Sequence, residues 1–232
     1  CAALFKANGA EIAVLDLDGT KAAETARRLG GAALGLSCDV TDGASVRAAF
    51  EQIAAHFGGL DILISNAGAA WQGRIGEVDE KILHQSFELN FFGHQRVAQE
   101  AVKIMLAQGT GGCLLFNVSK QAVNPGRDLG AYGAAKAALL ALVRQYALEH
   151  GADGIRSNGL NPDRIRSGLL TEAMIKARAA ARGVSEADYM SGNLLGAEVT
   201  ADDVAQAFVA LALLPKTTGN IITVDGGNVA AM

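Results

Sequence analysis

The chain has 232 residues, of which 50% are hydrophobic and 19% charged, and its formal net charge is −4. This length fits a single domain with a full hydrophobic core, and the acidic balance gives no reason to expect nucleic acid as a partner. No apolar run approaches the roughly 20 residues of a membrane span, so no membrane partner is expected. The cysteines Cys1, Cys38 and Cys113 show neither metal-ligand spacing nor a disulfide framework. We therefore expect no metal, a reducing cytoplasmic setting and no signal peptide.

Short apolar runs alternate with amphipathic stretches along the chain. Strands are expected at 11–16, 33–38, 61–65, 113–118, 155–160 and 221–224. Helices are expected at 20–29, 44–57, 80–106 (one or two), from 131 onward, within 168–189 and at 201–214. Thr41-Asp42 is a plausible cap for the helix at 44–57. Continuous apolar strands that alternate with helices are typical of a parallel sheet covered on both faces. The predicted fold class is therefore α/β, a Rossmann-like doubly wound parallel sheet in three α/β/α layers.

The first nine residues, Cys1 to Gly9, have the pattern of a helix end closed by glycine. A doubly wound fold starts with a strand and a glycine-rich turn before its first helix. We expect that strand and turn to be missing from this sequence, either because the chain is a fragment or because its start is omitted.

Asp16 ends the first expected strand, where a carboxylate can accept hydrogen bonds from the ribose of an adenosine. The next residues, Leu17 and Asp18, include no arginine that would receive a 2′-phosphate, which favours NAD over NADP. A polar turn after a strand explains Asp16 and Asp18 equally well. After the following strand, Asp39 and Val40 are placed to meet the adenine edge.

Small residues follow the next strand as an Asn-Ala-Gly turn at 66–68, where they would let a cofactor approach the main chain closely. An ordinary turn explains that segment about as well. Asn90 with Gly93 indicates either a helix irregularity or a buried polar link to Lys136.

The most informative spacing is Ser-x12-Tyr-x3-Lys, formed by Ser119, Tyr132 and Lys136. Ser119 follows a buried strand, whereas Tyr132 and Lys136 lie one turn apart on the same face of a helix. A phenol has a pKa near ~10, and a neighbouring ammonium should lower it enough for base catalysis. A serine hydroxyl can hold and polarise the reacting oxygen. A Tyr-x3-Lys pair alone is usually a solvated helix face, so the interpretation depends on the serine and the other motifs.

Together these motifs resemble the short-chain dehydrogenase/reductase family over nearly the whole chain. The resemblance is carried by Asp16, Asp39-Val40, Asn66-Ala67-Gly68, Asn90-x-x-Gly93, Ser119, Tyr132-x3-Lys136, Asn158 with Pro162, and Val224-Asp225-Gly226-Gly227. It implies an NAD(P)-dependent enzyme in which Ser119 orients the substrate and Tyr132 is the general acid/base. Lys136 would lower the tyrosine pKa and bind the nicotinamide ribose, and Asn90 would support a water-mediated proton relay. Pro162 and Ile165 would bind the cofactor, with main-chain groups of Ile165 near the carboxamide.

Two segments, 117–126 and 163–170, resemble one branch of that family. This branch is the dehydrogenase module that follows a sugar-phosphate aldolase in bifunctional rhamnulose-phosphate aldolase/short-chain dehydrogenase proteins. The resemblance implies carbohydrate catabolism, a small polar hydroxyaldehyde or alcohol such as lactaldehyde as substrate, and an upstream aldolase domain. The alanine-rich helix from 131 suits a close-packed subunit interface, which predicts a homodimer or homotetramer.

One departure from the family lies in the expected substrate lid, 163–196, of the single domain 1–232. Asp163 stands where the family has glycine, and it either restricts the turn or pairs with Arg164 or Arg166. The basic residues of the lid suit a polar or anionic substrate, although solvated helix charges explain them at least as well. Lys120, immediately after Ser119, is a sharper candidate for substrate contact, although an ordinary exposed loop lysine is the simpler explanation.

Two other functions share parts of this pattern. A non-catalytic nucleotide-binding module would keep the fold, but the complete Ser-Tyr-Lys set argues against it. A sugar-nucleotide epimerase or dehydratase shares Tyr-x3-Lys, but such enzymes usually need a larger C-terminal substrate domain than the 96 residues after Lys136.

Overall fold

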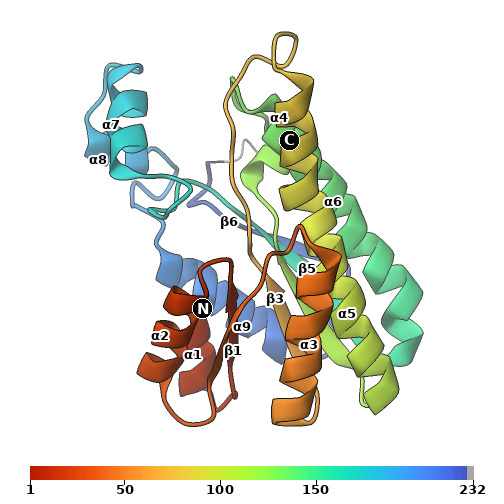
Figure 1. The fold of residues 1–232 in the computed structure, drawn as a ribbon. Helices are drawn as coiled ribbons and strands as arrows, with labels where there is room; N and C mark the ends of the chain where they lie inside the picture. The colour runs from red at the N-terminus through yellow and green to blue at the C-terminus, as the bar shows by residue number, and fades with distance from the viewer. Residues whose placement is uncertain (229–232) are drawn as a thin grey trace.

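The computed structural model describes residues 1–228, and every pair of neighbouring strands in it is parallel (Figure 1). The strands are β1 (Ala13–Asp16), β2 (Leu34–Ser37), β3 (Ile62–Ser65), β4 (Gly112–Asn117), β5 (Ile155–Pro162) and β6 (Ile221–Val224). Within the described residues, β1 pairs with β2, and the other four form a separate sheet in the order β3-β4-β5-β6. No strand of residues 1–228 joins β1 to β3, so the parallel sheet consists of two pieces.

Helices cover both faces of the strands. They are α1 (Ala2–Ala7), α2 (Gly19–Leu29), α3 (Gly43–Phe57), α4 (Glu80–Phe87), α5 (Gly93–Gln108), α6 (Gly130–His150), α7 (Glu172–Ala180), α8 (Glu186–Met190) and α9 (Ala201–Leu213). Figure 1 shows α3, α5 and α6 grouped on one side of β3–β5, with α1, α2 and α9 on the other. The α/β prediction of three layers is thus confirmed, and the predicted elements lie within a few residues of the observed ones.

The central strand β4 shows why both faces must be covered. Leu114 and Phe116 pack with α3, α5 and α6, whereas Cys113 and Leu115 pack with α1 and α9. All four side chains are buried, as expected for a parallel strand between two helix layers. Burial raises the pKa of the Cys113 thiol, so this cysteine is a core residue.

Aspartate side chains begin three of the helices. Asp18 accepts a hydrogen bond from the Lys21 amide at the start of α2, and Asp42 accepts one from the Ala44 amide at the start of α3. Asp79 does the same for α4. A carboxylate at this position pairs an amide that has no partner inside the helix and also suits the helix dipole. The cap expected near position 42 is therefore present.

The predicted helical stretch 80–106 is interrupted in its middle. Between α4 and α5 the chain forms a π-helical turn, Glu88–Phe92, centred on Asn90. Such turns insert one extra residue into a helix and often occur at functional sites. The helix irregularity considered for Asn90 is thus observed.

The segment carrying α7 and α8 projects from the rest of the chain in Figure 1. It has its own small apolar cluster, made of Leu170, Ile175, Ala179, Tyr189 and Met190. Residues 229–232, the end of the predicted domain 1–232, lie outside the described residues. Within residues 1–228, no helix is both long and apolar enough to cross a membrane.

Candidate active site

The parallel strands bring the predicted site residues to one edge. Asp16 ends β1, Asn66 follows β3 directly, and Ser119 lies two residues after the end of β4. Asp39 follows β2, and Asp225 follows β6 directly. Because the carboxyl ends of parallel strands lie at the same edge of a sheet, residues far apart in sequence share one surface, where ligands bind in open α/β folds.

Ser119 is held where strand β4 turns away from the sheet. Its amide donates to Asn161 Oδ1 over 3.4 Å, and its hydroxyl oxygen accepts from the Gln121 amide over 3.1 Å. The Ser119 hydroxyl lies close enough to the Tyr132 phenol to lower its pKa. The strand end and the first turn of α6 therefore meet as the spacing predicts.

Tyr132 and Lys136 occupy the first two turns of α6, and both are buried. The Lys136 Nζ lies 5.8 Å from the centroid of the Tyr132 ring. The expected fall in the Tyr132 pKa is not found, because burial raises that pKa more than the Ser119 hydrogen bond lowers it. The predicted direction of the Tyr132 pKa shift was wrong, because the prediction considered the neighbouring ammonium and omitted the desolvation of the phenol.

Lys136 is a buried cation whose charged form is disfavoured by desolvation. Its Nζ donates to the Asn117 carbonyl over 2.9 Å and lies 3.2 Å from His94 Nε2. Burial lowers the Lys136 pKa from 10.5 to about 7, so the side chain can exchange a proton near neutral pH. A lysine buried in this way is typical of functional sites.

His94 and Ser65 complete this cluster, and neither was singled out from the sequence. His94 lies one residue after the start of α5, and its Nδ1 is 2.6 Å from Ser65 Oγ. Both side chains are buried. The only sequence signal was a histidine in a helix next to the Asn90-x-x-Gly93 motif, and the pattern did not show that it would face Lys136.

Asn90 stabilises the turn after β3. Its Nδ2 donates to the carbonyls of Ala69 and Ser86 over 2.9 and 3.0 Å, and its Oδ1 accepts from the Ala69 amide. A Cβ at Gly68 would lie 2.9 Å from Asn90 Oδ1 and 3.8 Å from Lys136 Nζ. The Asn90 side chain therefore ties the Asn-Ala-Gly turn to the π-helical turn, and the described hydrogen bonds give it no direct link to Lys136.

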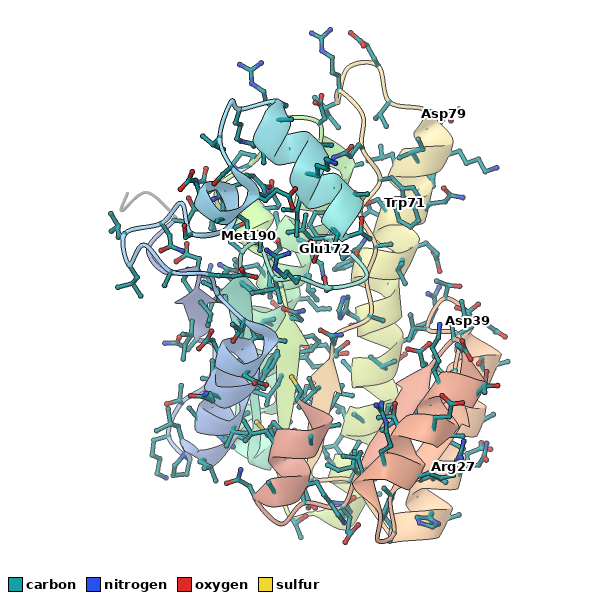
Figure 2. The ribbon with its side chains drawn as sticks, turned by 90° about the vertical axis from the view of Figure 1, so that its left-hand side faces the viewer. Arg27, Asp39, Trp71, Asp79, Glu172 and Met190 are labelled. Carbon is teal, nitrogen blue, oxygen red and sulfur yellow. The ribbon has the colours of Figure 1, made fainter. Side chains whose placement is uncertain are left out.

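Two carboxylates lie on the β1–β2 side of the edge. Asp16 is exposed, and its Oδ1 accepts from the Asp18 amide over 2.8 Å, which leaves its other oxygen toward solvent. Asp39 accepts from the amide and the hydroxyl of Thr41, and these bonds lower its pKa. Figure 2 shows Asp39 at the end of the α2–α3 region nearest Trp71. Val40 packs close to Gly93, where a Cβ would lie 2.9 Å from Val40 Cγ2.

The residues of this edge fit parts of a dinucleotide. An exposed carboxylate at Asp16 suits a ribose diol, and the exposed turn Asn66-Ala67-Gly68 presents main chain without bulky side chains. Asn66 Oδ1 accepts from Asn117 Nδ2 over 2.7 Å, which ties this turn to the end of β4.

On the other side of Ser119, charged groups surround Asp163. Its Oδ2 lies 3.2 Å from Lys120 Nζ and 3.4 Å from Arg164 Nε, and it also accepts from Asn228. The considered pairing with Arg164 is therefore observed. The pairing with Arg166 was wrong, because Arg166 binds Glu172 and Glu198 instead.

Several lid cations are already engaged. Arg164 has a positive φ of 52° and donates to the carbonyl of Tyr189 over 2.6 Å, while its guanidinium stacks on the Tyr189 ring. Arg182 stacks on that ring too. Figure 2 shows Glu172 at the start of α7 and Met190 beside it in the same projecting segment. The basic character predicted for this segment is thus largely balanced by internal contacts.

The remaining family motifs hold loops at both edges of the sheet. Asn158 donates to the Thr217 carbonyl and accepts from the Asn220 amide, which secures the turn before β6. Asp225 Oδ1 accepts from the Gly227 amide over 2.8 Å. Pro162 ends β5, and Ile165 packs against the α9 side of the core.

Among residues 1–228, no group of three His, Cys, Asp or Glu side chains could hold a metal ion. A surface hollow of about 670 Å³ lies at the amino ends of β3–β5, lined by residues such as Asp61, Gly112 and Arg156. That hollow is at the opposite edge of the sheet from Ser119, so it is separate from the candidate active site.

Comparison with known proteins agrees with this geometry. A family model described as enoyl-(acyl carrier protein) reductase matches residues 1–228. The uncharacterized oxidoreductase YuxG of Bacillus subtilis is 35% identical over 98% of this chain, which spans 35% of YuxG. D-threitol dehydrogenase of Mycolicibacterium smegmatis is 32% identical over 97% of this chain and 86% of its own length.

Two solved structures share the fold closely. A gluconate 5-dehydrogenase from Burkholderia cenocepacia, in complex with NADP and tartrate, has a TM-score of 0.90 and 28% identity, covering 100% of this chain and 90% of its own. A 3-ketoacyl-(acyl-carrier-protein) reductase from Brucella melitensis, complexed with NADH, has a TM-score of 0.87 and 27% identity, covering 97% and 91%. The chain belongs to the short-chain dehydrogenase/reductase family of oxidoreductases.

Replacing Lys136 with methionine should stabilise the fold while removing a site residue. Unfolded lysine has a pKa of 10.5 and folded Lys136 about 7, so wild-type stability rises with pH between these values. We expect Lys136→Met to increase the free energy of unfolding at pH 7 by roughly 1–3 kcal/mol, less at pH 9. Denaturant unfolding of the full-length protein at both pH values measures this. Lys103→Met, at an exposed lysine, is the control; a gain that grows with pH would contradict the expectation.

Proposed function

We propose that this chain is the catalytic dehydrogenase domain of an NAD-dependent enzyme that oxidises a small polar alcohol or hydroxyaldehyde, or reduces the corresponding carbonyl. The observation that supports it best is the buried cluster of Ser119, Tyr132 and Lys136, in which the Lys136 Nζ lies 5.8 Å from the centroid of the Tyr132 ring. Bound NAD would supply the hydride acceptor for oxidation.

The proton chemistry follows from the three side chains. The Ser119 hydroxyl holds the substrate oxygen beside Tyr132, which takes the proton from an alcohol or from the hydrate of an aldehyde. Because burial raises the Tyr132 pKa, the phenolate needs the positive charge of Lys136 at the moment of proton transfer. In the reverse direction, Tyr132 returns that proton to the carbonyl oxygen.

NAD as the preferred cofactor is supported by Asp16. An exposed carboxylate at the end of β1 accepts hydrogen bonds from a ribose diol and repels a 2′-phosphate. NADP accompanies one solved neighbour and NADH another, so the choice depends on this chain's own residues. In this proposal Asp39 and Val40 border the adenine, and Pro162 with Ile165 borders the nicotinamide. The turn 66–68 lets the cofactor approach the main chain closely.

A small polar substrate is supported by the charged groups beside Ser119. Lys120 and Asp163 form a half-buried pair next to Arg164, and such groups bind hydroxyl and carbonyl oxygens better than hydrocarbon. We propose that 163–196 is the lid over this substrate. Lactaldehyde remains the leading example, and the relative named D-threitol dehydrogenase acts, by its name, on a small polyol.

The same proposal includes the oligomeric state of the protein, a further domain and its cellular location. Alanines 134, 137 and 141 form an exposed stripe on α6 with Leu148, which suits packing against a second copy in a homodimer or homotetramer. YuxG is much longer than this chain, which is compatible with an additional aldolase domain in the full-length protein. We place the enzyme in the cytoplasm, in carbohydrate catabolism.

Tyr132→Phe tests the reaction itself. Removing the phenol should reduce kcat for alcohol oxidation roughly 10²–10⁴-fold, because the base is lost. Turnover of lactaldehyde and small polyols with NAD by the full-length protein measures this. Tyr146→Phe is the matched control, since Tyr146 is also buried on α6 but bonds Gln95 away from Ser119. Unchanged turnover in Tyr132→Phe would refute the proposed chemistry, and NAD binding without turnover would favour a non-catalytic module.

Asp16→Ala tests the cofactor. Loss of the hydrogen bonds to a charged acceptor should lower kcat/KM for NAD about 10-fold or more and leave NADP less affected. Steady-state kinetics with both cofactors measures the change in preference. Asp153→Ala, at an exposed aspartate near the far end of α6, should leave it unaltered. An unchanged ratio in Asp16→Ala would show that another residue selects the cofactor.

Lys120→Met tests the substrate end of the site. We expect KM for a polar substrate to rise roughly 5-fold or more with kcat changed less, because a charged hydrogen-bond donor is lost. Lys103→Met removes an exposed lysine of α5, outside the proposed lid, and serves as the control. Equal KM values for the wild type, Lys120→Met and the control would show that Lys120 does not bind the substrate.

A further inference from the structure

His94 forms a contact that none of the recognised motifs includes. Its ring is buried with 2% of its surface exposed, and Nε2 lies 3.2 Å from Lys136 Nζ. Its other nitrogen, Nδ1, lies 2.6 Å from Ser65 Oγ. The ring therefore bridges the end of β3 and the second turn of α6.

The chemistry of the partners determines the form of the ring. A lysine ammonium carries three donors and no acceptor, so it can bond Nε2 only where that nitrogen has a lone pair. The proton of the neutral ring then lies on Nδ1, which donates to Ser65 Oγ. Burial and the charge of Lys136 both lower the His94 pKa well below its ordinary value, which agrees with a neutral ring.

The surroundings of His94 add no competing charge among the described residues. Strand β3 contributes the Ser65 hydroxyl, β4 contributes the Phe116 ring at 6.4 Å between centroids, and the main chain of Ala67 hydrogen-bonds the imidazole. Lys136 is the charged group that acts on the ring. His94 thus lies next to one cation, the Lys136 ammonium, and accepts a hydrogen bond from it.

The same contact completes the bonding of Lys136. One of its three donors goes to the Asn117 carbonyl and a second to His94 Nε2. The third is left for the open edge of the site, where Gly68 lies near. Without an acceptor at position 94, the ammonium would lose one of two described partners in a buried place, which disfavours its charged form.

We propose that His94 is a positioning residue for Lys136: its neutral ring, oriented by Ser65, accepts a hydrogen bond from the ammonium and keeps that charge present beside Tyr132. This inference rests on the proposed function, because it concerns the charge that assists proton removal by Tyr132. Ser65 Oγ accepts the Nδ1 proton and holds the ring in the orientation that turns Nε2 toward Lys136.

The first experiment measures kcat for alcohol oxidation against pH in the full-length protein. His94→Leu removes the acceptor, so the acidic limb should move up by about one pH unit, which is about a 10-fold loss at pH values below it. His94→Gln places an amide oxygen near the position of Nε2 and should restore the limb to within a few tenths of a unit. His84→Leu, at an exposed histidine of α4, should match the wild type.

A limb unchanged in His94→Leu, or moved equally in His94→Leu and His94→Gln, would overturn the proposal. A merely structural role would lower the amount of folded enzyme and leave the limb in place.

A second measurement needs no turnover and therefore separates this inference from the proposed function. Nitrogen-15 NMR of labelled histidine in the wild-type protein should show His94 as the neutral Nδ1–H tautomer down to well below pH 6.5. A ring that titrates near 6.5, or one protonated on Nε2, would refute the inference even if the enzyme is active. If no substrate is turned over but the Nδ1–H tautomer is present, the contact stands and the proposed reaction fails.

Discussion

The buried cation of Lys136 is the constraint around which the site is arranged. A lysine at the core side of α6 is costly unless its hydrogens find acceptors. The Asn117 carbonyl at the end of β4 and the His94 ring on α5 provide them. The fold thus keeps a base whose pKa lies near 7 next to a tyrosine whose pKa burial has raised. This combination is poor for stability and suited to proton transfer, as is common at functional sites.

Parallel topology explains how such distant residues meet. Each strand carries its polar residues at its carboxyl end, so residues from Asp16 to Asp225 lie along one edge although over 200 positions separate them. The apolar strand β4, packed on both faces, anchors that edge to the core through Leu114 and Leu115. The π-helical turn Glu88–Phe92 directly precedes α5, which carries His94 to its contact with Lys136. The π-helical turn and the parallel topology therefore both bring residues to the region around Lys136.

The substrate side follows a different principle. Asp163 occupies a position where the family has glycine, and its carboxylate draws Lys120 and Arg164 together. The lid arginines are mostly balanced by glutamates or stacked on Tyr189, so the charge available to a substrate is concentrated near Ser119. For the proposed function, this arrangement is the reason to expect a small polar substrate and not a strongly anionic one. It also explains why the composition of the lid alone was a weak guide.

The sequence alone determined the features that depend on local spacing. The four-residue step from Tyr132 to Lys136, the aspartate cap at Asp42 and the apolar run of β4 all follow from helix and strand periodicity, and they predicted the fold class and most element bounds. Only the tertiary structure decided the pairing of His94 with Lys136, 42 residues apart, and of Lys120 with Asp163, 43 apart. It also decided the direction of the Tyr132 pKa. Burial and contacts between distant segments control these properties, and no local pattern in the chain records how deeply a side chain will be buried or which group will face it.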